Sequence, residues 1–115
     1  MRIYACVKQV PANNETRLDP VTGTLIREGS PGVLNPMDAY AVEQALRLKE
    51  QYGGEVSALS MGIPGARDML RRVVALGVDR GILLTDRAFA GSDTLATARV
   101  LAAAVKKRGM PDLIL

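Results

Sequence analysis

Residues 86–101, DRAFAGSDTLATARVL, place small, hydroxyl-bearing and acidic side chains directly ahead of a helical pattern. The candidate binding residues in this run are Gly91, Ser92, Asp93, Thr94 and Thr97. The free N–H groups and partial positive charge of a helix start suit a phosphate, and a glycine lets a ligand approach the backbone closely. Because Asp or Ser ahead of a helix is also the usual N-cap, two interpretations stay open: a phosphate site and an ordinary cap.

Three further groups of residues flank predicted strands and helices in the same way. They are Cys6, Val7 and Lys8 after the first predicted strand, Met61 and Gly62 after the second, and Asn35, Pro36, Met37 and Asp38 before the first predicted helix. Asn35 followed by Pro36 predicts an N-cap and a first helical residue, and Asp38 is placed to complete the capping arrangement. Strand ends and helix starts share one edge of a parallel sheet, so we expect all four groups to surround one site.

Other chemistries lack the residues that they need. The chain has no histidine and one cysteine, so neither histidine-based catalysis nor a metal cluster is predicted. It has no G-x-x-x-x-G-K-[ST] loop, and no G-x-G-x-x-G follows the first predicted strand. Cys6 lies in an apolar run without a histidine to activate it, so we interpret it as a structural residue.

The composition is that of a folded, globular protein with a mild positive charge. Of the 115 residues, 48% are hydrophobic and 23% are charged, and the net charge is +3. Aromatic residues make up 3%, too few to stack on bases, so no nucleic-acid binding is predicted. No apolar run approaches the ~18 residues of a membrane span, so no membrane insertion is predicted. The single cysteine favours a reducing compartment, which we predict to be the cytoplasm.

Short apolar runs alternate with helical patterns along the chain. The predicted strands are 3–7, 55–61, 80–85 and 112–115, and the predicted helices lie at 37–52, 66–74 and 95–105. This order predicts an α/β fold around a parallel sheet with right-handed crossovers. Gly77 and Gly109 follow the second and third predicted helices, where glycine is the usual C-cap.

One connection is longer than such a fold requires. Residues 10–34 join the first strand to the first helix, although such loops usually take about 2–6 residues. The segment RLDPVTGTLIREG within it predicts a β-hairpin. An excursion at the carboxyl end of the first strand lies where an open α/β sheet holds its ligand, which favours a functional role. Because the sequence ends inside the fourth predicted strand, we interpret 1–115 as the N-terminal part of a single domain.

Six segments of the sequence belong together as a family pattern. In chain order they are CVKQVP, RLDPVTGTLIREG, NPMDAYAVEQALRLKE, EVSALSMG, ALGVDRGILLTDRAFAGSDTLATA and PDLIL. Together they resemble the beta subunit of electron transfer flavoprotein. The resemblance covers essentially the whole chain. It implies a three-layer, Rossmann-like α/β fold that binds an adenine nucleotide, with the remainder of the domain and a C-terminal arm expected beyond residue 115.

The resemblance also implies an electron carrier subunit rather than a stand-alone enzyme. Beta subunits of this family pair with an alpha subunit that carries the redox-active FAD. The pair moves electrons between flavin dehydrogenases, such as acyl-CoA dehydrogenase, and downstream acceptors. In the housekeeping branch the beta subunit holds AMP, whereas in the electron-bifurcating branch it holds a second FAD that is reduced by NADH.

Carried over by position, the resemblance assigns the nucleotide to the same four groups. Cys6 and its neighbours would lie beside the adenosine, residues 35–38 would wrap it, and Met61 would line the pocket. The run AFAGSDTLAT matches the phosphate-side loop of the FAD-binding branch, so FAD is favoured over AMP. Ala98-Arg99 stand where many FAD-binding members have a serine and an aromatic residue.

A second hypothesis rests on the predicted fold alone. A non-redox nucleotide-binding module, such as a universal-stress-like protein or a structural AMP binder, would also have a ligand edge without catalytic residues. An FAD-carrying partner subunit would argue against this alternative.

Overall fold

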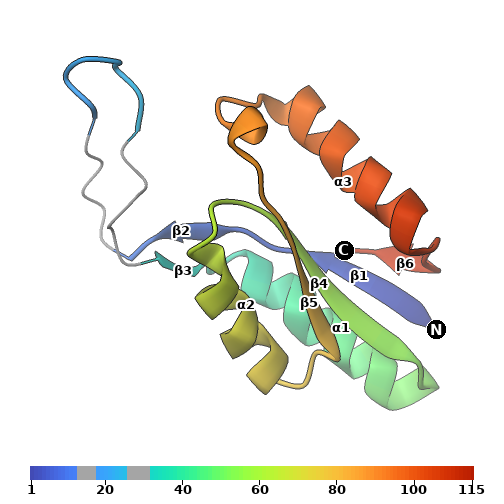
Figure 1. Ribbon diagram of the computed structural model, residues 1–115. Helices are drawn as coiled ribbons and strands as arrows, with labels where there is room; N and C mark the ends of the chain where they lie inside the picture. Colours follow the sequence, from blue (N-terminus) through green and yellow to red (C-terminus); the bar gives the residue numbers. More distant parts are fainter. Residues whose placement is uncertain (13–17, 26–31) are drawn as a thin grey trace.

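The computed structural model describes residues 1–12, 18–25 and 32–115 (Figure 1). Its main sheet has four parallel strands: β1 (Arg2–Cys6), β4 (Glu55–Met61), β5 (Arg80–Leu84) and β6 (Leu113–Ile114). The helices between them are α1 (Asp38–Tyr52), α2 (Ala66–Ala75) and α3 (Thr94–Arg108). Every predicted strand and helix is present, which confirms the predicted α/β fold.

The helices form a layer on each face of the sheet. Figure 1 shows α1 and α2 on one face and α3 on the other. Side chains alternate along β1, so that Ile3 and Ala5 pack in the cluster beneath α1 and α2, while Tyr4 packs with Val105 of α3. Both faces of the strands are apolar for this reason. Within the described ranges, no helix is both long and apolar enough to cross a membrane.

The strand order β5-β4-β1-β6 places the turning point of the sheet between β1 and β6. The chain leaves β1 for α1 on one face and reaches β6 from α3 on the other. At this junction the Cys6 N–H donates to the Leu115 carbonyl over 2.8 Å. Open α/β sheets bind ligands at the carboxyl ends of the strands beside such a turning point. The candidate ligand site of this fold is therefore the end of β1.

Glycines allow close packing and tight helix ends. A Cβ on Gly81 of β5 would lie 3.1 Å from the Cβ of Leu70 on α2, so the glycine lets this helix approach the sheet edge. Gly77 and Gly109 both have positive φ, +123° and +117°. They follow α2 and end α3, as the sequence predicts, because side chains are strained in this conformation.

The long connection after β1 begins and ends in a short antiparallel ladder. β2 (Gln9–Pro11) pairs with β3 (Gly32–Leu34). Gln9 lies over Gly32, where its side chain occupies the space that a Cβ would fill. Strand pairs of three residues are too short to give a periodic signal, so the sequence did not predict this ladder.

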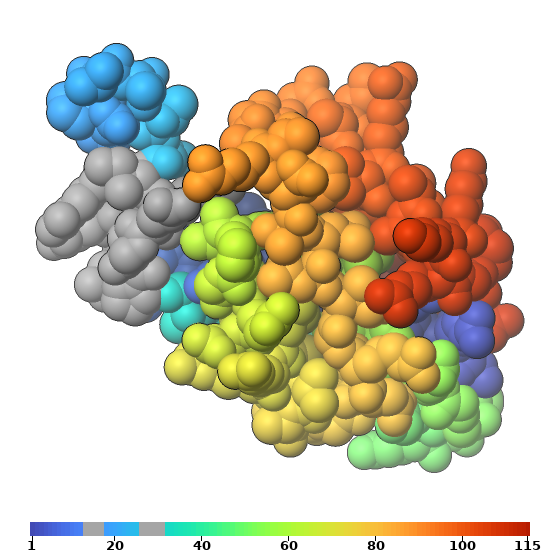
Figure 2. Space-filling model, viewed as in Figure 1, coloured from blue at the N-terminus to red at the C-terminus, as the bar shows by residue number. Residues whose placement is uncertain are grey.

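The middle of the connection turns back on itself as predicted. Leu18 and Leu25 form an antiparallel bridge, and the Asp19 N–H donates to the Thr24 carbonyl over 2.8 Å. The turn confirms the centre of the predicted hairpin, whereas the arms at 13–17 and 26–31 lie outside the described residues. Figure 2 shows the tip, in blue, standing clear of the helices and the sheet.

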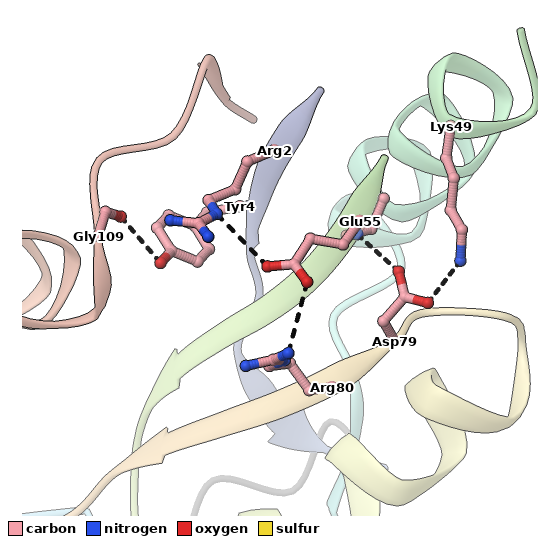
Figure 3. Close-up of polar contacts among 8 residues, drawn as sticks. Arg2, Tyr4, Lys49, Glu55, Asp79, Arg80 and Gly109 are labelled. Atoms are coloured by element: carbon pink, nitrogen blue, oxygen red, sulfur yellow. Dashed lines mark hydrogen bonds and ion pairs between the residues drawn. The ribbon is translucent and has the colours of Figure 1, made fainter. Parts of the chain in front are cut away.

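Charged side chains close the amino edge of the sheet (Figure 3). Glu55 at the start of β4 pairs with Arg2 and with Arg80, each over 3.4 Å. Asp79 pairs with Lys49 of α1 over 2.7 Å, and this hydrogen bond is the main cause that lowers the pKa of the Asp79 carboxyl. These groups lie at the edge opposite the predicted site, so we assign them to holding α1 and the strands in place.

Candidate functional site

The end of β1 lies between its two neighbouring strands. Val7 is buried, and its N–H donates to the Leu59 carbonyl of β4 over 2.9 Å. Cys6 is half-buried and is bonded to Leu115 beside β6, while Lys8 is exposed. The first group of predicted residues therefore lies at the centre of the carboxyl edge.

Cys6 has the environment of an unreactive thiol. Burial raises the pKa of the Cys6 thiol, and the negative charge of Asp38 raises this pKa further. A thiol with a raised pKa is a poor nucleophile at neutral pH, because little of it is ionised. The environment supports the interpretation of Cys6 as a structural residue.

The start of α1 differs from the predicted capping arrangement. Regular helix begins at Asp38, and Met37 is the N-cap residue without a side-chain cap, so the prediction of Pro36 as the first helical residue is wrong. The Asn35 carbonyl instead accepts from the Asp38 N–H over 2.9 Å. The Asn35 Oδ1 accepts a long hydrogen bond of 3.4 Å from the Met37 N–H. A tight turn thus precedes the helix.

Asp38 bonds to the end of β1 rather than capping its own helix. Its Oδ2 accepts from the Lys8 N–H over 2.8 Å, and the Lys8 carbonyl accepts from the Asn35 N–H over 2.9 Å. Two of the four predicted groups are therefore in direct contact. Local spacing could not reveal this contact, because the two bonded residues are 30 positions apart.

The end of β4 adds a polar residue, Ser60, which the sequence places at this strand end but which was not assigned to the nucleotide. Ser60 is 1% exposed, and its hydroxyl has no hydrogen-bond partner among the described residues. By alternation with Ala58 it lies on the face covered by α1 and α2. The half-buried Met61 follows, and the Gly62 N–H donates to the Leu84 carbonyl over 3.0 Å. A hydroxyl at the end of an apolar strand was the only signal in the sequence.

The start of α3 has the contacts of an ordinary N-cap. The Asp93 Oδ1 accepts from the Ala96 N–H over 2.8 Å. Ahead of it, a short 3-10 turn, η1 (Arg87–Phe89), is joined to the helix by the Ser92 hydroxyl, which donates to the Phe89 carbonyl over 2.6 Å. Gly91 has a φ of +75°, and a Cβ built there would meet nothing within 4 Å. The loop is therefore capped by its own side chains and open to approach at Gly91.

The structure brings the four predicted groups to one edge of the sheet, but it does not bring all of them into contact. Hydrogen bonds connect the end of β1 with both β4 and the start of α1. Figure 1 shows the start of α3 at the same edge but apart from the junction of β1 and α1. Thr94 is exposed there and Thr97 is half-buried.

The hollows described on the surface are not centred on the predicted site. One has a volume of about 580 Å³ and lies along the outer side of α1, lined by Pro36, Met37, Ala39, Tyr40, Val42, Glu43, Leu46 and Leu76. Another, of about 360 Å³, lies between α2 and β5. Only Pro36 and Met37 of the predicted residues line either hollow. These hollows therefore do not mark the predicted site. A ligand at the end of β1 would also contact residues that line neither hollow.

Comparison with known proteins decides the family. The model of the electron transfer flavoprotein domain matches residues 22–115. The chain belongs to the electron transfer flavoprotein domain family. This confirms the resemblance found in the sequence and does not favour the alternative of a non-redox module.

Curated relatives share about half of their aligned residues with this chain. The electron transfer flavoprotein subunit beta of Clostridium acetobutylicum is 54% identical over 107 residues, which cover 93% of this chain and 41% of the relative. The caffeyl-CoA reductase-Etf complex subunit CarD of Acetobacterium woodii is 53% identical over 116 residues, 100% of this chain and 44% of the relative. Protein FixA of Azorhizobium caulinodans is 52% identical over 118 residues, which cover 99% of this chain and 42% of the relative. The chain thus spans about two-fifths of the length of these relatives.

Proposed function

We propose that this chain contributes the first part of the nucleotide-binding domain of an electron transfer flavoprotein beta subunit. The observation that carries the proposal is the family match over residues 22–115, joined to a sheet whose turning point lies beside residues 6–8 and 35–38. The bound nucleotide would lie across the carboxyl ends of β1 and β4. The whole subunit would pair with an FAD-carrying alpha subunit and transfer electrons.

The polar groups at this edge fit an adenine nucleotide. The buried hydroxyl of Ser60 has no hydrogen-bond partner among the described residues, and because buried hydroxyls ordinarily have a partner, it could bond to a ligand at this edge. Glycines at 62 and 91 allow close approach of a ligand to the backbone. We assign the adenosine to residues 6–8, 35–38 and 61–62, and the phosphates to Gly91, Ser92, Thr94 and Thr97.

We favour FAD over AMP as the nucleotide. The open approach to Gly91 and the hydroxyl of the exposed Thr94 would serve a diphosphate longer than the phosphate of AMP. When bound, an FAD supplies reversible two-electron and one-electron redox chemistry. The residues of this chain would position that group and exclude water from it.

The proposed electron donors and acceptors follow from the relatives. The relative from Acetobacterium woodii is named as a subunit of a complex of caffeyl-CoA reductase with Etf. We therefore propose acyl-CoA dehydrogenases or related flavin dehydrogenases as partners, in addition to the alpha subunit. We place the complex in the cytoplasm, in keeping with a single cysteine in the chain.

Counting nucleotides in the natural full-length complex tests the proposal. The beta subunit would be co-expressed with its alpha subunit, purified and extracted with acid, and flavin and AMP would be quantified by chromatography. Two FAD molecules per heterodimer are expected. One FAD with one AMP would overturn the choice of FAD, and one FAD without a second nucleotide would overturn nucleotide binding by this subunit.

A further inference from the structure

We propose that the outer edge of β5 is a docking site for an extended, acidic segment of a partner protein. The segment would pair with β5 as a further strand of the sheet, and its carboxylates would bind two arginines of α2. The site lies at the side of the sheet, separated from the end of β1 by β4, and it does not depend on nucleotide binding.

Half of the peptide groups of β5 face away from the sheet. Within the described residues β5 pairs with β4 alone, and Figure 1 shows α2 alongside it. The Leu84 carbonyl accepts from the Gly62 N–H of the β4 side over 3.0 Å. Because successive residues of a strand direct their N–H and C=O groups to opposite sides, those of Gly81 and Leu83 point outward. Such groups are a template for an added strand.

The smaller of the two hollows lies beside these peptide groups. It has a volume of about 360 Å³ and is lined by Arg67, Leu70, Arg71, Val74, Gly81 and Leu83. Leu70 is 4% exposed and Val74 is 37% exposed, so the hollow has an apolar floor and a partly open apolar wall. Gly81 is exposed and has no side chain to cover its own peptide group. An added strand could therefore place an apolar side chain here while it pairs with β5.

The charge of this hollow favours an acidic segment. Two of its lining residues are arginines and none is a carboxylate. No ion pair among the described residues includes Arg67. Arg71 pairs with Asp68 over 3.3 Å, but these side chains are 71% and 77% exposed, so the pair is weak. Both guanidinium groups can thus bind carboxylates of a partner.

The carboxylates at the two ends of β5 already have partners. Glu55 pairs with Arg80 at the start of the strand over 3.4 Å. Asp86, beyond the end of the strand, accepts from the Ala88 N–H over 2.8 Å. Neither carboxylate lines the hollow, so the arginines determine the charge that a segment meets there.

A second copy of this chain fits the edge less well than an acidic partner. Two β5 strands that paired about a two-fold axis would bring the same patch of each copy together. Both α2 helices would then lie on one face of the joined sheet, with Arg67 and Arg71 of each copy near those of the other. Like charges repel, so the edge favours a different protein.

The test measures peptide binding to the natural full-length complex. The probe is an acetylated nine-residue peptide in which threonines alternate with one valine, two glutamates and one valine, so that the charged and apolar side chains share one face of a strand. A peptide with lysines in place of the glutamates is its control. Calorimetry should show binding of the acidic peptide at least about tenfold tighter than that of the basic one.

Two variants separate the charges from the backbone. Arg67→Glu combined with Arg71→Glu should reverse the preference, so that the basic peptide binds more tightly. Arg72→Glu is the matched control, because Arg72 is an exposed arginine of the same helix that does not line the hollow, and the preference should persist. Leu83→Pro removes an outward N–H, which an edge strand tolerates, and should weaken the acidic peptide about tenfold. Urea denaturation confirms that each variant is folded.

Hydrogen exchange locates the peptide on the sheet. The Leu83 amide should exchange rapidly in the complex alone and about tenfold more slowly with saturating acidic peptide, whereas the inward Ile82 amide should be protected in both states. Equal affinity for the two peptides, an unchanged preference in the double variant, or no binding would overturn the proposal. A Leu83 amide that is protected before peptide is added would also overturn it, because another segment of the complex would then already cover β5.

Discussion

At the scale of single residues, a polar side chain near the candidate site can bond to a backbone group at a strand end instead of to its own helix. Asp38 illustrates this, because its three-residue spacing from Asn35 predicts a local cap, yet its carboxylate bonds to Lys8. A strand end and a helix start meet only once the sheet forms, so this contact depends on the tertiary fold. The residue types at the site were predictable from the sequence, whereas their bonding partners were not.

Gly54 is expected to be intolerant of any side chain. Its φ is +105°, and a Cβ there would collide with the backbone of Met1, whose carbonyl accepts from the Glu55 N–H. We predict that Gly54→Ala lowers the free energy of unfolding by more than about 2 kcal/mol. Gly23→Ala is the control, since Gly23 also has positive φ but open space around it, and should cost about 1 kcal/mol. Equal losses in urea denaturation would contradict the steric argument.

Asp79 is expected to make stability depend on pH in the acid range. Because its pKa is lowered in the folded state, first by the hydrogen bond from Lys49 and then by that from the Val56 N–H, ionised Asp79 favours folding. This contribution is complete above the ordinary carboxyl pKa of 3.8. It is lost as the pH falls below that value and through the lowered pKa.

The variant Asp79→Asn removes the titrating group while keeping an acceptor for the Val56 amide. We predict that its free energy of unfolding decreases less steeply than that of the unmodified protein as the pH falls below 3.8. Urea denaturation at a series of pH values measures this slope. Asp68→Asn, which removes an exposed carboxylate that pairs with Arg71, controls for loss of a negative charge. The same slope in Asp79→Asn and the unmodified protein would refute the prediction.

At the scale of elements, periodicity predicted the helices and long strands because each buries a continuous apolar face. In α2 the buried residues recur every three to four positions, as in Ala66, Met69, Leu70 and Val73. In β4 five consecutive residues are buried, which is typical of a strand covered on both faces. Short elements escaped prediction for the same reason. η1 and the ladder of β2 and β3 span three residues each, which is too few for a period to emerge.

The start of α3 depends on its cap. The Asp93 carboxylate satisfies the Ala96 N–H over 2.8 Å, and the negative charge complements the helix dipole. We predict that Asp93→Ala lowers the free energy of unfolding by about 1 kcal/mol. Thr94→Ala, one position into the helix, should cost less than half as much in the same urea denaturation. If Thr94→Ala costs as much as Asp93→Ala, the cap is not the source of the loss.

At the scale of the whole molecule, the groups that hold the fold together and the proposed ligand edge lie at different parts of the sheet. The two core clusters draw on β1, β4, β5 and the three helices, and no described residue of 12–31 belongs to either. Ion pairs close the amino edge (Figure 3), whereas the long connection starts from the carboxyl edge. Alternation of strands and helices predicted the layers. The strand order required the tertiary fold, because it depends on which face each helix covers.

This division predicts that the excursion can be shortened without loss of the fold. Replacing residues 12–31 by a two-residue turn between Pro11 and Gly32 should change the free energy of unfolding by no more than about 1 kcal/mol, since loop-closure entropy varies slowly with length. The tip exposes Leu18 by 61% and Val21 by 90%, which leaves apolar side chains on the excursion that a ligand or partner could cover. We therefore expect the shortened protein to lose nucleotide affinity or electron transfer with its partner by about tenfold or more.

Calorimetry and a dye-reduction assay on the full-length complex would measure these losses, with urea denaturation reporting the fold. Leu18→Ser and Val21→Ser provide a second route, because they change the tip without shortening the chain. A loss of partner transfer in these variants at unchanged nucleotide affinity would assign the tip to partner contact. Loss of folding on shortening would contradict the separation of core and excursion, and unchanged binding and transfer in all three variants would contradict a functional role for the excursion.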